Sequence, residues 1–152
     1  MRQTEILLDE LNRVFGGNAW HGPALRNLLD GVNEKQAKEH PIENVHSIRE
    51  LVVHIGTWMD VVAHRLAGKV VDSTTVPDWS DLTKRSWRET VEELERAQSR
   101  LCDAVARMTS EDLETTVPGK SITRHFEILG VIEHTVYHTG QISLLKKAKF
   151  KN

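Results

Sequence analysis

Two histidines near the C-terminus, His134 and His138, lie four residues apart in a segment with helical periodicity. On an α-helix, residues at this spacing differ by about 40° around the axis and about 6 Å along it, so both imidazoles can point at one atom. Zinc metalloproteases use the same spacing. However, Thr135 follows His134 and Tyr137 precedes His138, so the glutamate base of such proteases is missing. The pair therefore indicates either a metal site without protease chemistry or a chance pair of packed histidines.

A third histidine, His54, lies at the edge of an apolar helical stripe beside Leu51 and Trp58. If this helix packs near the last one, three imidazoles can converge. Three protein nitrogens leave one coordination position open for water or substrate, which is typical of catalytic zinc sites. The other interpretation is a half-buried histidine whose nitrogens bond to a backbone or carboxylate partner. Spacing alone leaves both interpretations open.

The other five of the eight histidines are weaker candidates, expected on turns, helix ends and solvated faces: His21, His40, His46, His64 and His125. Of these, His21 lies at a helix break next to Trp20 and could reach a pocket. Glu127 and Glu133 could accept hydrogen bonds from ligand imidazoles, although ordinary surface roles are expected for both.

Composition narrows the class of protein. A chain of 152 residues fits one domain, and 20 Lys and Arg against 22 Asp and Glu give a net charge of -2. Without a basic excess we expect neither a nucleic acid nor an anionic membrane as partner. The single cysteine, Cys102, excludes an intramolecular disulfide and a cysteine-rich metal site. The first residues do not form a signal-peptide pattern and no long uncharged apolar window occurs, so we expect a cytoplasmic protein.

Helical periodicity dominates the chain and predicts an all-α fold. Ser47 and Glu50 form a capping box at the start of a long helix. A loop at residues 69–80 contains Trp79. A four-helix bundle buries the apolar stripe of every principal helix. The four predicted helical segments, the first of them interrupted, are residues 3–15 with 24–31, 47–68, 81–108 and 123–148.

The third segment has a heptad pattern that predicts packing against another helix. Its two seams consist of Trp87, Leu94, Leu101 and Met108, and of Val91, Gln98 and Val105.

The run from His134 to Ile142, H-T-V-Y-H-T-G-Q-I, resembles the H-x-x-Y-H-x-G-Q-I signature that ends proteins of the DinB-like superfamily, which includes the bacillithiol S-transferases. The similarity extends to Trp20-His21-Gly22-Pro23, to the S-I-x-E-L-x-x-H-I pattern from Ser47, and to Trp79 and Trp87. It covers nearly the whole chain, so we expect a single domain at residues 1–152.

The resemblance implies an up-down-down-up four-helix bundle, often dimeric. It also implies one divalent metal ion held by His54 on the second helix and by His134 and His138 on the fourth. Members bind zinc or nickel, among other ions. Characterised enzymes mostly transfer a low-molecular-weight thiol or isomerise through one, and others are described as metal-dependent hydrolases. The family name refers to induction by DNA damage and not to DNA binding.

We therefore expect a homodimeric enzyme that transfers a low-molecular-weight thiol to a small electrophile. Tyr137 and Gln141 could orient the site, while Trp20, His21 and Trp79 would form the pocket mouth. The single cysteine lies beside the heptad seam, so the thiol would arrive as a cosubstrate. The alternatives are a hydrolase with a metal-activated water, for which no spacing identifies a base, and a non-enzymatic metal-binding stress-response protein.

Overall fold

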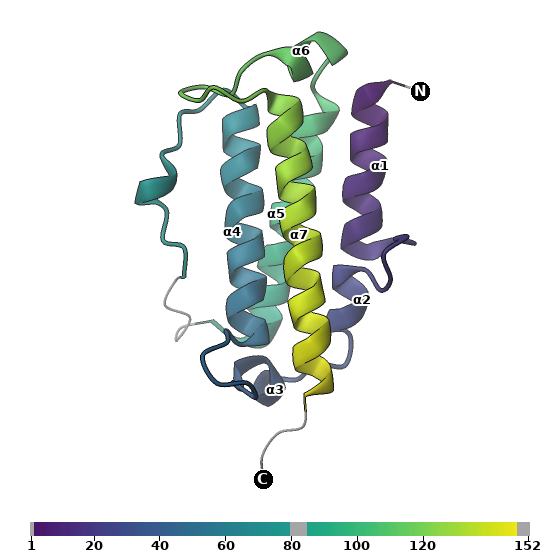
Figure 1. Cartoon of the computed structure of the whole chain (residues 1–152), viewed down its shortest axis with the longest axis vertical. Coiled ribbons are helices and arrows are strands. Elements are labelled where there is room, and N and C mark those ends of the chain that lie inside the picture. The colour runs from purple at the N-terminus through teal and green to yellow at the C-terminus, as the bar shows by residue number, and fades with distance from the viewer. Residues whose placement is uncertain (1, 80–84, 149–152) are drawn as a thin grey trace.

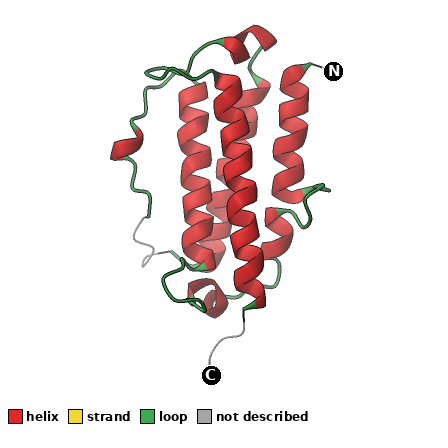
Figure 2. Ribbon diagram, in the orientation of Figure 1, coloured by secondary structure: helices red, strands yellow, loops and turns green. Residues whose placement is uncertain are grey.

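The computed structural model describes residues 2–79 and 85–148. Within these ranges it contains seven α-helices, one 3₁₀-helix and no β-structure beyond an isolated bridge between Thr116 and Thr123. The predicted all-α class is confirmed (Figure 2). The elements are α1 (Gln3–Gly16), α2 (Leu25–Leu29), α3 (Glu34–Lys38), α4 (Ile48–Leu66), η1 (Ser73–Thr75), α5 (Trp87–Ala106), α6 (Ser110–Glu114) and α7 (Arg124–Lys147).

The four longest helices, α1, α4, α5 and α7, lie side by side (Figure 1). α4 packs against both α5 and α7, and α1 contacts the same two helices. Their facing side chains form an apolar core, and burial of this surface is the main favourable contribution to folding. Each long helix supplies fully buried members, among them Leu11, Ile55, Leu101 and Ile142.

α4 begins where the sequence predicts, because Ser47 and Glu50 cap each other. The Ser47 hydroxyl accepts a hydrogen bond from the Glu50 amide at 3.2 Å, and the Glu50 carboxylate accepts one from the Ser47 amide at 2.7 Å. This exchange satisfies two amides near the start of the helix. The helix ends at Leu66, shortly before Gly68, whose φ of 90° favours glycine.

α5 begins at Trp87, whereas the sequence predicts a start at residue 81. The predicted first residues, 81–84, lie outside the described part of the chain. Ser86 fixes the observed start, because its hydroxyl accepts from the Glu89 amide at 3.2 Å while its own amide donates to the Glu89 carboxylate at 2.7 Å.

The heptad seam of α5 packs inward as predicted. The polar seam residue Gln98 is also buried. Its side-chain amide donates a hydrogen bond to the Leu11 carbonyl at 3.2 Å, so the buried amide nitrogen has a partner. The positions of the first seam are all buried: Trp87, Leu94, Leu101 and Met108.

The predicted interruption of the first helical limb is present, since α1 ends at Gly16 and α2 begins at Leu25. The last helix also agrees with its prediction. The Thr123 hydroxyl accepts from the Phe126 amide at 3.2 Å and caps α7, which runs to Lys147.

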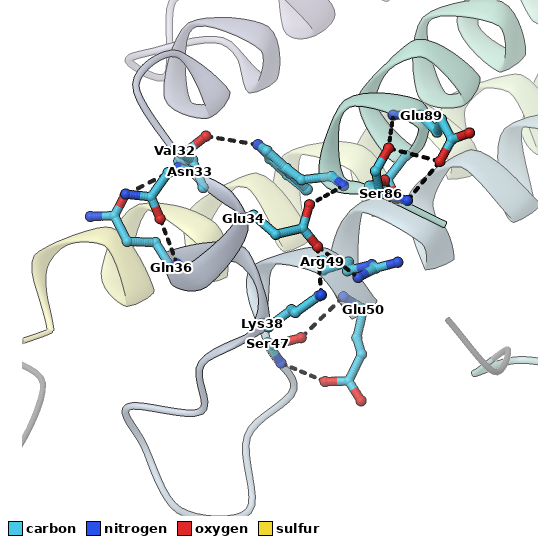
Figure 3. A network of polar contacts seen from close by, with 12 residues as sticks. Val32, Asn33, Glu34, Gln36, Lys38, Ser47, Arg49, Glu50, Ser86 and Glu89 are labelled. Carbon is cyan, nitrogen blue, oxygen red and sulfur yellow. Dashed lines mark hydrogen bonds and ion pairs between the residues drawn. The ribbon is translucent and has the colours of Figure 1, made fainter. Parts of the chain in front are cut away.

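One carboxylate, that of Glu34 on α3, joins the starts of α4 and α5 (Figure 3). It pairs with Lys38 at 2.6 Å and Arg49 at 3.3 Å, and it accepts from the Trp87 amide at 2.5 Å. The Trp87 indole donates to the Val32 carbonyl at 2.8 Å. These contacts hold together the end of the bundle where α4 begins, about two turns before His54.

Among the described residues, every helix is too short or too polar to cross a lipid bilayer.

Candidate metal centre

His54 lies about two turns into α4 and is buried, with 6% of its surface exposed. The apolar stripe that contains Leu51 and Ile55 faces the core, which turns the neighbouring imidazole inward. His134 and His138 lie one turn apart on α7. Because α4 and α7 pack against each other, all three imidazoles reach the same space.

The three histidines have the spacing of ligands to a single ion. One ligand nitrogen of each lies within 4.8 Å of the other two, and the Nε2 atoms of His54 and His134 are 2.9 Å apart. Nitrogens bound to tetrahedral zinc at 2.0–2.1 Å lie about 3.3 Å from one another. The donor set therefore fits one divalent metal ion with one coordination position left open.

Two of the imidazoles are oriented through their Nδ1 atoms. His54 Nδ1 lies 3.0 Å from the Asp78 carbonyl, and His138 Nδ1 lies 2.6 Å from Oε1 of Gln141. Because both oxygens can only accept, each Nδ1 carries the proton and each Nε2 keeps a free lone pair. Metal-binding histidines usually have this second hydrogen bond, which fixes the tautomer and the ring orientation.

Asp78 has a further role through its side chain. Its Oδ1 accepts from the Trp58 indole at 3.0 Å and lies 3.3 Å from His54 Nδ1. One loop residue thus contacts two α4 side chains, and this holds the loop after η1 against the histidine site.

His134 is less buried than His54 and His138, but its pKa is strongly lowered. Burial is the main cause, and the charges of the neighbouring His138 and His54 also contribute, so that together they bring the pKa to about 4. Burial also lowers the pKa of His138. Both rings are therefore neutral at pH 7, the form in which imidazole binds a metal. Within the described part of the chain, His134 Nδ1 is buried without a hydrogen-bond partner.

Trp79 covers one side of the site. Its ring stacks on His54 with centroids 4.3 Å apart and on His46 with centroids 3.4 Å apart, so the indole lies between two imidazoles. His46, which the sequence predicts to be solvated, has 44% of its side chain exposed but also stacks on a loop residue 33 positions later.

Two cavities flank the histidines. One, of about 200 Å³, lies between α4 and α7 and has His134 in its wall. The other, of about 300 Å³, has His138 in its wall together with Asn44, His46, Tyr137 and Gln141. We name them the Trp58 cavity and the Gln141 cavity. The walls of the Trp58 cavity include Trp58, Val62, Ile122, Phe126, Val131 and His134.

The other predicted site residues separate into two groups. Tyr137 and Gln141 line the Gln141 cavity, and the Tyr137 ring lies edge-on to His138 at 5.0 Å. Trp20 and His21 are exposed and line neither cavity. Their connection between α1 and α2 projects on the side of the molecule opposite the η1 loop (Figure 1).

Neither glutamate that could have supported the imidazoles does so. Glu133 is exposed on α7, and Glu127 instead pairs with Arg65 at 2.7 Å in the interior. Cys102 is half-buried, and burial together with the charge of Asp103 raises its pKa to about 11. The Cys102 thiol is thus protonated at neutral pH, which disfavours it as a nucleophile.

The sequence does not indicate that Asp78 and Trp58 contact the histidine site. Trp58 is recognisable only as a member of the α4 stripe. Asp78 lies in an irregular loop, where no periodicity indicates what a side chain or carbonyl contacts. The adjacent Trp79 is the one signal, since a tryptophan in a loop usually packs against the protein surface.

The fold and the site together define an all-α protein with three histidines of metal-binding spacing between two packed helices. The sequence model of the DinB superfamily matches residues 19–142, and the chain belongs to this superfamily. Among solved structures, the crystal structure of a conserved protein from Enterococcus faecalis is similar, with a TM-score of 0.76 and 15% identity over 97% of each chain. At this identity the likeness shows the fold alone. A comparison with curated proteins found no match.

Proposed function

We propose that this member of the DinB superfamily is a metal-dependent enzyme that transfers a low-molecular-weight thiol to a small electrophile. The observation that carries the proposal is the position of the three-histidine site between two cavities of different character. A transfer between two substrates needs two binding spaces next to one reacting centre. Hydrolysis needs only one such space and a water molecule.

The histidines and three residues that contact them would each have a role in this reaction. His54, His134 and His138 would hold one zinc or nickel ion. When bound, the metal lowers the pKa of a thiol in the open position, so that the sulfur is deprotonated at neutral pH. The Asp78 carbonyl and Gln141 keep the two imidazoles in their ligating tautomer, and Trp79 restricts the access of water.

The transfer is a substitution at carbon. The sulfur forms a bond to the electrophilic carbon, and the leaving group departs with the electron pair of its bond to that carbon. The thiol proton passes to solvent. The Gln141 cavity would take the thiol cosubstrate, since the amide and imidazole groups of Asn44, His46 and Gln141 offer hydrogen bonds to its polar parts.

The test compares apo and metal-loaded protein with bacillithiol, glutathione or cysteine as the thiol and a chlorinated compound or an epoxide as the electrophile. We expect turnover only with metal and thiol together. Equal rates for apo and loaded protein would refute the proposal.

Hydrolysis is the less favoured activity because the carboxylate beside the site is poorly placed as a base. Asp78 Oδ1 faces Nδ1 of His54 and accepts from the Trp58 indole, whereas the ligating Nε2 is on the opposite side of the His54 ring. Metal-dependent cleavage of esters or amides without any thiol would support hydrolysis instead.

We also propose a single-domain bundle of up-down-down-up topology that works as a homodimer. Support for the topology comes from the connections: the link between α4 and α5 spans 20 residues, long enough to return along the molecule, and includes η1 (Figure 1). Trp20 supports a dimer, because its side chain is fully exposed and exposed tryptophans are enriched at protein interfaces. Sedimentation of wild type and Trp20→Ala tests this, with a weaker dimer expected for the variant.

A further inference from the structure

The Trp58 cavity has a composition unlike that of the Gln141 cavity. Two aromatic side chains, Trp58 and Phe126, and the aliphatic Val62, Ile122 and Val131 form most of its wall. Phe126 is 63% exposed although it is a large apolar side chain. A ligand in the cavity would cover part of this ring, which favours an apolar ligand over a polar one.

We propose that the Trp58 cavity binds the apolar part of the electrophile, about one aromatic ring in size, so that the substrates of the enzyme are small apolar electrophiles such as benzylic ones. This inference rests on the proposed function for the reaction itself, but the binding of the ring is a separate property of the cavity.

The cavity opens to the surface, and its volume indicates the size of the ligand group that it can cover. It measures about 200 Å³, and an apolar cavity of about 150 Å³ in another protein is enough to bind benzene. Most binding pockets for whole drug-sized ligands are larger, at about 300–1,000 Å³. The Trp58 cavity therefore suits a single ring or a branched aliphatic group.

The charged residues in the wall do not offer a free charge to a ligand. Arg65 Nη1 donates to Glu127 at 2.7 Å, and Arg65 Nε and Nη2 donate to the Val71 carbonyl at 3.1 and 2.8 Å. Lys120 lies 3.8 Å from the same Glu127 oxygen. The guanidinium and the carboxylate neutralise each other in charge, although Glu127 Oε2 has no hydrogen-bond partner among the described residues.

The position of His134 orients the ligand. It is the one member of the histidine triad in the wall of this cavity, and its Nε2 points to His54. A ring bound between Trp58 and Phe126 would therefore place a one-carbon substituent toward the three histidines. The electrophilic carbon would then lie near the sulfur of a thiol that approaches from the Gln141 cavity.

Gly130 gives a direct way to fill the cavity. It lies in its wall, and a Cβ built on Gly130 meets no atom within 4 Å outside its own helix backbone. A leucine there has free space for its Cβ and would extend from the wall of the cavity, and it favours the helix more than glycine does. Gly140 on the same helix is an equally open position that lines neither cavity, so Gly140→Leu is the matched control.

The first measurement is the binding of toluene by saturation-transfer NMR and titration, with the metal-free chain. We expect toluene to bind wild type and Gly140→Leu within about twofold of each other, and Gly130→Leu at least tenfold more weakly. A second variant, Val62→Ala, enlarges the cavity and should bind p-xylene several-fold more tightly than wild type does. Equal toluene affinity in wild type and Gly130→Leu, or no toluene binding at all, would overturn the proposal.

The second measurement compares benzyl chloride with chloroacetate, which carry the same leaving group. Gly130→Leu should raise the KM for benzyl chloride at least tenfold and leave the KM for the thiol unchanged. An equal effect on both electrophiles would overturn the assignment. If toluene binding responds as expected but no thiol supports turnover, the proposed function fails while the cavity assignment stands.

Discussion

The Nε2 atoms of His54 and His134 lie 2.9 Å apart, although the two residues are 80 positions apart in the sequence. The Asp78 carbonyl fixes the His54 proton on Nδ1, so His54 Nε2 carries a lone pair. At this distance the second nitrogen must either donate a proton to that lone pair or share a cation with it. The two rings are therefore arranged so that a metal ion can replace one shared proton.

Removal of one ligand should abolish metal binding. We expect untagged wild-type protein to carry close to one metal ion per chain, and His54→Ala and His134→Ala to carry almost none, because two nitrogens rarely hold a divalent ion against a chelator. Elemental analysis after gel filtration measures this. His64→Ala, an exposed histidine on the same helix as His54, is the control and should keep its metal. Full metal occupancy in His134→Ala would contradict the site.

Gln141 should affect the metal affinity of the site by orienting His138 and not by binding the metal itself. Gln141→Leu removes the acceptor 2.6 Å from His138 Nδ1, so we expect metal affinity to fall about 10–100-fold, the usual effect of losing such a partner. Gln141→Glu keeps an acceptor and should restore most of the affinity. Competition with a chromophoric chelator gives the affinities. If the two variants bind metal equally weakly, the hydrogen bond is not the cause.

Trp79 should slow the exit of the metal. Its ring stacks on both His46 and His54, and Trp79→Ala opens this side of the site to water and chelators. We expect the rate of metal loss to a chelator to rise several-fold, with a smaller rise for Trp79→Phe, which keeps a stacked ring. Stopped-flow measurement of chelator absorbance follows the loss. Unchanged rates in Trp79→Ala would mean that the indole does not restrict access.

Helix positions were predictable from the sequence because the signals for them are local. The capping box of Ser47 and the break after Gly16 involve neighbours in the chain, and both occur as predicted. Periodicity also placed His54 on the inner edge of α4. The start of α5 was predicted too early, because an apolar heptad pattern does not show which residue first caps the helix.

The loop side of the site was not predictable in the same way. Asp78 supplies a carbonyl to His54 and a carboxylate to Trp58, but a backbone carbonyl has no sequence signature. The exposed position of Trp20 depends on how the connection between α1 and α2 leaves the helices, which propensities do not encode. Tertiary contacts between a loop and a helix face determine both features.

Glu34 should stabilise the fold in a pH-dependent manner. The hydrogen bond from Lys38 and then the one from the Trp87 amide lower the pKa of Glu34 below its ordinary 4.5. Because the folded pKa is depressed, the contribution is complete above about pH 4.5 and is lost as the pH falls through the folded pKa. Glu34→Gln should therefore have a lower urea midpoint than wild type at pH 7, and the difference should disappear in acid.

The control for Glu34 is Glu133→Gln, an exposed position in the middle of α7. Its urea midpoint should match that of wild type at both pH values. A difference for Glu34→Gln that persists unchanged in acid would show that the carboxylate charge is not responsible.

Arg65 and Glu127 should be strongly coupled in stability, because they form an ion pair with only 2% and 7% of their side chains exposed. Arg65→Met leaves the buried Glu127 carboxylate with only Lys120, at 3.8 Å, as a charged partner, and removal of one member of such a pair costs about 3–5 kcal/mol. Replacement of both by apolar side chains removes the buried charge as well, so Arg65→Met/Glu127→Leu should be more stable than Arg65→Met alone. Urea unfolding of Arg65→Met, Glu127→Leu and the double variant gives the free energies of a double-mutant cycle. Additive losses would mean that Arg65 stabilises the fold through the Val71 carbonyl and not through Glu127.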